Sequence, residues 1–133
     1  MNPLAEQQQG ALIAYLLGRE SGLAVPKPYE RDIYLFDTYV AGTTHVEGME
    51  EIGESLEEDD KLVFYREPEN RHDPQAIRIE TVREEKIGYV PKQDNVVFSR
   101  LMDAGKVLFA KVISKEMRGS WLRIKIKIYL HES

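Results

Sequence analysis

Two apolar segments near the end of this chain decide its fold: VLFAKVISKE (Val107–Glu116) and WLRIKIKIYL (Trp121–Leu130). In the second segment apolar residues alternate with polar ones, mostly bases: Leu122, Ile124, Ile126, Ile128 and Leu130 against Arg123, Lys125, Lys127 and Tyr129. A period of two over this length indicates a half-buried strand with one basic face. The linking residues MRGS contain Gly119, so the two segments are predicted to form a hairpin.

Four shorter apolar segments precede the hairpin and are also typical of strands. The first runs from Ile33 to a break at Gly42, and the others cover 61–67, 76–82 and 86–91. Segment 92–106 has apolar residues at helical spacing and stops at Gly105, which predicts one internal helix, while 49–55 is a turn or a short helix. The connections are too short for helical crossovers. We therefore expect a mainly β domain, a small antiparallel barrel of about six strands.

The N-terminal part has a different character from the barrel. Leu4–Leu17 places apolar residues at helix-compatible spacings, and Pro26 and Pro28 make the following segment an extended linker. We expect residues 1–31 to be a helix and linker, and residues 32–131 to be the barrel domain. The apolar side of the helix needs a partner, which is the domain itself, a second copy or another protein.

Composition limits the class of protein. The chain has no cysteine, no apolar run near the roughly 20 residues of a membrane helix, and no basic stretch of a signal peptide before its first apolar residues. We therefore expect a cytoplasmic protein without membrane association. The net charge of -5 hides an uneven distribution, because Glu47–Asp60 holds eight acids and no base, whereas Ala104–Leu130 holds seven bases and one acid. Both runs can be simply solvated surface. Alternatively, the basic run forms a face that holds a short polyanion.

Catalytic and metal-binding patterns are missing from the sequence. The histidines His45, His72 and His131 are not spaced as metal ligands, and no nucleophile elbow, phosphate-binding glycine loop or EF-hand spacing occurs. We expect no catalytic residues, no metal and no cofactor. The polar segment EPENRHDPQAI (Glu67–Ile77) is typical of a turn, because prolines fix backbone angles and Asn70 and Asp73 can bond their own backbone.

Three ordered motifs resemble one family: VAGTTHVEG (Val40–Gly48), YREPENRHDPQAI (Tyr65–Ile77) and KIGYVPKQDN (Lys86–Asn95). Together they are similar to the HIRAN domain family. The resemblance implies a modified OB-like or SH3-like barrel. In a helicase-like transcription factor that carries this domain, the barrel captures the free 3'-hydroxyl end of single-stranded DNA and helps to remodel stalled forks.

The resemblance also implies a set of DNA-binding residues: Thr44, His45, Asn70, His72, Asp73, Tyr89 and Lys92. A carboxylate such as Asp73 accepts a hydrogen bond from a terminal hydroxyl and repels a phosphate. Lys92 offers a phosphate contact, and Tyr89 and His72 offer flat faces for stacking. This chain departs from the DNA-binding member at Thr44, His45 and His72, where that member has arginine, tyrosine and tyrosine.

The function expected is capture of single-stranded DNA ends in repair or replication, without catalysis, together with a helicase or nuclease partner. One alternative is a protein-interaction module that docks such a partner through the acidic segment or the N-terminal helix. A metal-dependent hydrolase is a third alternative. Steep loss of binding with salt favours the first, salt-insensitive docking the second, and turnover stopped by a chelator the third.

Overall fold

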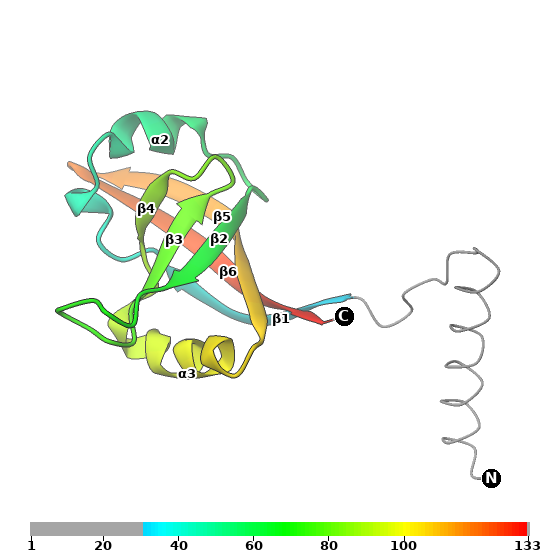
Figure 1. The fold of residues 1–133 in the computed structure, drawn as a ribbon. Helices are drawn as coiled ribbons and strands as arrows, with labels where there is room; N and C mark the ends of the chain where they lie inside the picture. The colour runs from blue at the N-terminus through cyan, green and yellow to red at the C-terminus, as the bar shows by residue number, and fades with distance from the viewer. Residues whose placement is uncertain (1–30, 133) are drawn as a thin grey trace, which may run out of the picture. The chain divides into compact units, whose positions relative to one another are not determined.

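The computed structural model describes residues 31–132, which form one six-stranded sheet (Figure 1). The helix and linker expected for residues 1–31 lie outside the described residues, apart from Arg31, which begins β1. The strands are β1 (Arg31–Tyr39), β2 (Lys61–Arg66), β3 (Ile77–Thr81), β4 (Lys86–Tyr89), β5 (Val107–Arg118) and β6 (Trp121–Glu132). Their order in the sheet is β1-β6-β5-β2-β3-β4, and every pair is antiparallel. The mainly β, antiparallel prediction is confirmed.

The β5–β6 hairpin supplies much of the core, as its alternation predicts. Ile124, Ile126 and Ile128 are fully buried, while the side chains between them face outward and are only half-buried. Each such isoleucine contributes about 1.5–3 kcal/mol of hydrophobic stabilisation. β6 is paired on both sides, with β1 and with β5, so its outward bases are flanked by neighbouring strands.

The sheet curls until its two ends meet (Figure 1). Beyond β1, Ala41 pairs with Tyr89 of β4 through two backbone hydrogen bonds, each 2.8 Å from nitrogen to oxygen. Gly88 allows this approach, because a Cβ at that position would run into the carbonyl oxygen of Ala41. A single bridge therefore joins the first and last strands of the sheet order.

Two helices cover opposite ends of the curled sheet, and a short 3-10 turn, η1 (Thr43–His45), follows the bridge (Figure 1). The segment expected as a turn or short helix is α2 (Met49–Ser55), so the domain has a second internal helix besides the one foreseen. That one is α3 (Lys92–Asp103). It ends at Asp103, two residues before the predicted stop at Gly105, where the backbone is left-handed with φ of 93° and the amide of Lys106 donates to the carbonyl of Leu101.

No helix within residues 31–132 is both long and apolar enough to cross a membrane.

Candidate nucleic-acid interface

Tyr89 is the point at which the three sequence motifs meet. Its backbone pairs with Ala41, two residues before η1, and its hydroxyl donates a hydrogen bond of 2.8 Å to Glu67 at the end of β2. Lys92, the first residue of α3, follows Tyr89 by three residues. Segments far apart in the sequence thus lie around one tyrosine on the outer face of β4.

The segment Glu67–Ala76, here called the motif loop, is organised by Asn70. Asn70 Oδ1 accepts hydrogen bonds from the backbone amides of His72 (2.9 Å) and Asp73 (3.1 Å), and Asn70 Nδ2 donates to Glu67 (3.0 Å). The turn interpretation of the loop is confirmed. Both acceptor lone pairs of Asn70 are in use, so one amide hydrogen remains to contact a ligand.

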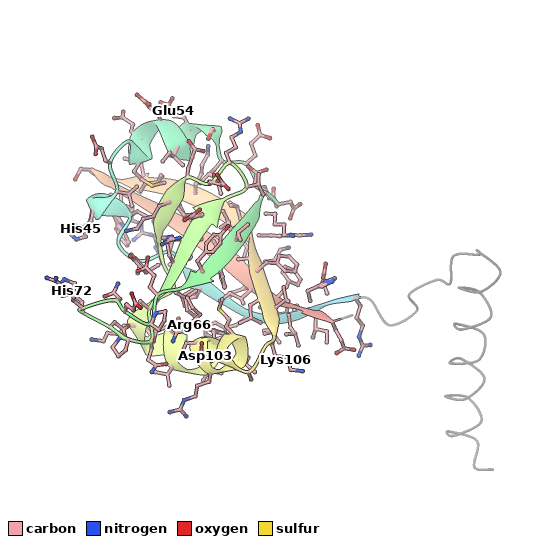
Figure 2. All side chains as sticks on the ribbon, viewed as in Figure 1. His45, Glu54, Arg66, His72, Asp103 and Lys106 are labelled. Carbon is pink, nitrogen blue, oxygen red and sulfur yellow. The ribbon has the colours of Figure 1, made fainter. Side chains whose placement is uncertain are left out.

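Arg66 fastens the motif loop to the end of α3. Its Nε donates to Asp103 at 2.8 Å, and its other guanidinium nitrogens donate to the carbonyls of Ala76 (2.8 Å) and Pro74 (3.1 Å). Figure 2 shows Arg66 and Asp103 close together at α3. A planar guanidinium that makes several such bonds fixes the loop against the helix.

Asp73 is held from two sides. Its Oδ2 accepts a hydrogen bond of 2.6 Å from Asn95 Nδ2, and its Oδ1 accepts one of 2.9 Å from the backbone amide of Gln75. The pKa of Asp73 lies below its usual value, chiefly because of the Asn95 bond; burial opposes this, and the Gln75 amide and the charges of Lys92 and Arg66 add to it. The carboxylate is therefore ionised, positioned and partly exposed.

Asn95 belongs to the candidate site, although the sequence did not single it out. Asn95 is 2% exposed, and among the described residues its Oδ1 has no hydrogen-bond partner. Helical spacing could have indicated that Asn95 is buried, because Asn95 precedes the buried Phe98 by three residues and therefore lies on the inward side of α3. A polar residue at an inward position needs a polar partner, which the fold supplies as Asp73.

Glu67 is a second residue of the candidate site that was not among the expected DNA-binding residues. It adds a second carboxylate beside Asp73. It accepts hydrogen bonds from Tyr89 and Asn70 on one oxygen and from Arg78 (2.7 Å) on the other. Burial raises the pKa of Glu67, but the bonds from Asn70, Tyr89 and Arg78 outweigh it, and the pKa lies below the usual value. Glu67 is thus a charged residue whose hydrogen bonds connect Tyr89, Asn70 and Arg78.

The family model described as HIRAN domain matches residues 33–133.

The chain belongs to the HIRAN domain family.

HIRAN domains are known as DNA-binding modules and are generally not catalytic. Two solved structures share the fold. A protein from Lactobacillus plantarum is 22% identical with a TM-score of 0.73, over 78% of this chain and 99% of the other. The HIRAN domain of human HLTF is 14% identical with a TM-score of 0.60, over 77% of this chain and 80% of the other. No curated protein matches.

Four of the expected site residues of this HIRAN domain are exposed: Thr44, His45, His72 and Lys92. Figure 2 places His45 on η1 and His72 at the tip of the motif loop, both at the same side of the domain in this view. The turn η1 is anchored through Thr43, which is buried and whose hydroxyl donates to the carbonyl of Leu122 at 2.8 Å. Thr44 and His45 are therefore exposed on a fixed segment.

Tyr89 presents less ring surface than the sequence implied. It is half-buried, and the ammonium of Lys86 lies 4.6 Å from the centre of its ring. At most one face of the ring is open for a base. Together, the residues of the candidate site supply two ionised carboxylates, one exposed ammonium and two exposed imidazoles. Within residues 31–132 no three acids or histidines cluster as metal ligands.

Proposed function

We propose that this HIRAN domain binds single-stranded DNA at a free 3'-hydroxyl end, on the surface made by η1, the motif loop, Tyr89 and the start of α3. The observation that carries the proposal is the Asp73 carboxylate, which is ionised, partly exposed and fixed by Asn95 and Gln75. A fixed acceptor costs little further ordering when a ligand arrives, which favours affinity.

The charges explain why an end is preferred over a continuing strand. A terminal hydroxyl can donate a hydrogen bond to Asp73, whereas a phosphate at the same place meets the negative charges of Asp73 and Glu67. Lys92 acts on Asp73 electrostatically, and its exposed ammonium can bind the phosphate that precedes the terminal sugar. His72 and His45 offer flat rings to the bases, each stacked base contributing about 1–3 kcal/mol.

The test is fluorescence anisotropy with short oligonucleotides that differ only in a 3'-hydroxyl or a 3'-phosphate. Wild type is expected to prefer the hydroxyl end by about tenfold or more, the value of one hydrogen bond to a charged acceptor. Asp73→Asn keeps the shape and removes the charge, so it should lose most of that preference. Glu58→Gln, an exposed acid outside the site, is the matched control and should bind as wild type does. Equal binding of both ends by wild type would falsify end capture.

The cellular role proposed with this activity is that of a non-catalytic module in DNA repair or replication. The domain would deliver a captured strand end to a helicase or nuclease in the cytoplasm. Its own residues supply recognition, and the partner supplies the chemistry. The membership in the HIRAN domain family supports this division.

A second candidate function is docking of a protein partner at the acidic segment. A cavity of about 290 Å³ lies between α2 and the β5–β6 hairpin, lined by Glu50, Glu54, Lys115, Met117 and Leu122, among others. Met117 is 58% exposed there, so an apolar side chain of a partner could be buried against it. Docking of this kind would resist added salt, whereas DNA binding falls steeply with salt.

A further inference from the structure

Three lysines form a row across the outer face of the sheet. Lys61 of β2 lies opposite Lys111 of β5, which lies opposite Lys127 of β6. Their chain neighbours Leu62, Ala110, Ile126 and Ile128 are fully buried, so the lysines point outward. With adjacent strands about 4.8 Å apart, this lysine row spans roughly 10 Å.

The row carries more positive charge than its surroundings balance. Like charges directly opposite each other destabilise a sheet. Asp59 lies 3.7 Å from the ammonium of Lys127, and among the described residues neither Lys61 nor Lys111 has an ion pair. Asp37 lies opposite Lys127 on β1, where its carboxylate also accepts a hydrogen bond of 2.8 Å from Tyr34, so two acids stand beside three lysines, both next to Lys127. An anionic ligand would remove this repulsion.

Aromatic side chains lie two residues along the strands from the row, at Phe109 of β5 and Tyr129 of β6, with Tyr34 of β1 beside them. Phe109 and Tyr129 stack with ring centres 5.3 Å apart, and Tyr34 packs edge-on against Tyr129 at 6.1 Å. The ammonium of Lys61 lies 4.9 Å from the centre of Phe109, and that of Lys111 lies 5.6 Å from Tyr129. Tyr34 is 54% exposed at the edge of this group. Phe109 is only 6% exposed and Tyr129 is half-buried, so the open ring that these fixed cations border is that of Tyr34.

Three other bases of the C-terminal basic run, Lys115, Arg118 and Arg123, make contacts within the domain. Lys115 donates to the carbonyls of Gly53 and Glu54 at the end of α2, and Arg118 pairs with Glu116. The guanidinium of Arg123 lies 3.9 Å from the centre of the Tyr39 ring. Only part of the basic run therefore forms the row, and Lys61 joins it from the end of the acidic segment.

We propose that the lysine row and its aromatic border bind the backbone of single-stranded DNA independently of a strand end. Regular cations beside aromatic rings are the combination that follows a polynucleotide without reading its sequence. The row is on β2, β5 and β6, whereas the end site is on η1, β4 and the start of α3 (Figure 1). This second surface does not require the end-capture function, and it gives an acidic protein a place to hold the rest of a strand.

The test uses circular single-stranded DNA, which has no 3' end. Wild type is expected to bind it with a slope of about -2 when the logarithm of the binding constant is plotted against the logarithm of the salt concentration. This is the value for three lysine–phosphate contacts on a single strand. The triple variant Lys61→Gln, Lys111→Gln, Lys127→Gln should weaken binding by about fivefold or more and flatten the slope. The change should not unfold the domain, because it relieves like-charge repulsion; thermal denaturation checks this, and single Lys111→Gln provides a milder variant.

A control variant removes the same charge elsewhere: Arg83→Gln, Arg100→Gln and Lys106→Gln, all exposed and outside the row (Lys106 is labelled in Figure 2). It should bind the circle within about twofold of the wild type. The proposal is overturned if wild type does not bind the circular DNA at low salt, or if an acidic peptide binds the lysine row instead. It is also overturned if the control variant loses as much affinity for the circle as the row variant. Asp73→Asn should keep binding to the circle while losing end preference, so failure of one proposal is distinguishable from failure of the other.

Discussion

At the scale of single residues, the pair Asn95 and Asp73 connects the interior to the site. Asn95 is buried in α3 and donates its amide hydrogen to the one carboxylate that we propose meets the DNA end. A buried donor that loses its acceptor, or an acceptor that loses its donor, costs about 1–3 kcal/mol. The bond therefore serves both the stability of the motif loop and the orientation of Asp73.

We predict that Asn95→Ala raises the pKa of Asp73 toward the ordinary aspartate value, because the Asn95 bond is the largest cause of its depression. Carbon-13 NMR titration of the Asp73 carboxyl measures this directly. Gln93→Ala, at an exposed position of the same helix, is the control and should leave the titration unchanged. A variant whose Asp73 titrates as in wild type would show that the bond is not what holds the charge.

The same pair predicts a pH dependence of stability. A carboxyl whose pKa is lower in the folded than in the unfolded state contributes stability above its unfolded pKa, about 3.9, and loses it as the pH falls through the folded pKa. Wild type should therefore be more stable than Asn95→Ala at neutral pH, and the gap should narrow below about pH 4. Urea denaturation over this pH range tests it; a gap that is independent of pH would assign the effect to packing.

At the scale of elements, the bridge between Ala41 and Tyr89 decides whether the motifs meet. It closes the sheet and places η1 beside β4, which is why Thr44 and His45 belong to the same surface as Tyr89. Gly88 is needed at the bridge, since its φ is 153° and a Cβ there would meet both the carbonyl of Ala41 and the side chain of Val40. Closure thus depends on one residue without a side chain.

We predict that Gly88→Ala destabilises the domain by about 2 kcal/mol or more, through strain and loss of the bridge. Gly42→Ala is the matched control, because Gly42 has φ of 78° but a Cβ there meets nothing within 4 Å. It should cost about 1 kcal/mol, the conformational penalty without the clash. Urea denaturation gives both values, and hydrogen exchange at the amides of Ala41 and Tyr89 reports the bridge. Equal losses in the two variants would mean that close approach is not the constraint at Gly88.

At the scale of the whole molecule, the buried side chains of the β5–β6 hairpin stabilise the fold, and the exposed surfaces are the ones proposed to bind DNA. We predict that Ile126→Ala costs about 2–5 kcal/mol, because it opens a cavity among fully buried side chains. Lys125→Ala, next to it on the outward face, should stay within about 0.5 kcal/mol of wild type. Thermal and urea denaturation measure both. Similar losses at the two positions would contradict the inward and outward faces of β6.

Much of this architecture could be predicted because it follows from local pattern. Alternation in 122–130 fixed the faces of β6, Gly105 marked the end of α3, and prolines with Asn70 and Asp73 marked the turn. The site was foreseen only in part. Asn70 and Asp73 were named as ligand contacts, and the structure adds the partners Glu67 and Asn95 that use several of their hydrogen-bonding groups. Such partners come from other elements, so no local pattern reveals them.

The sequence by itself determined which residues are strand, turn or helix and which side of each strand is apolar, since these depend on neighbours one to four positions away. The tertiary structure decided which charges lie together. Lys61 follows an acidic run, yet strand pairing places it beside Lys111 and Lys127, while Lys115 turns to cap α2. The reason is that strand register sets distances between residues that are far apart in the chain, and register follows from how the whole core packs.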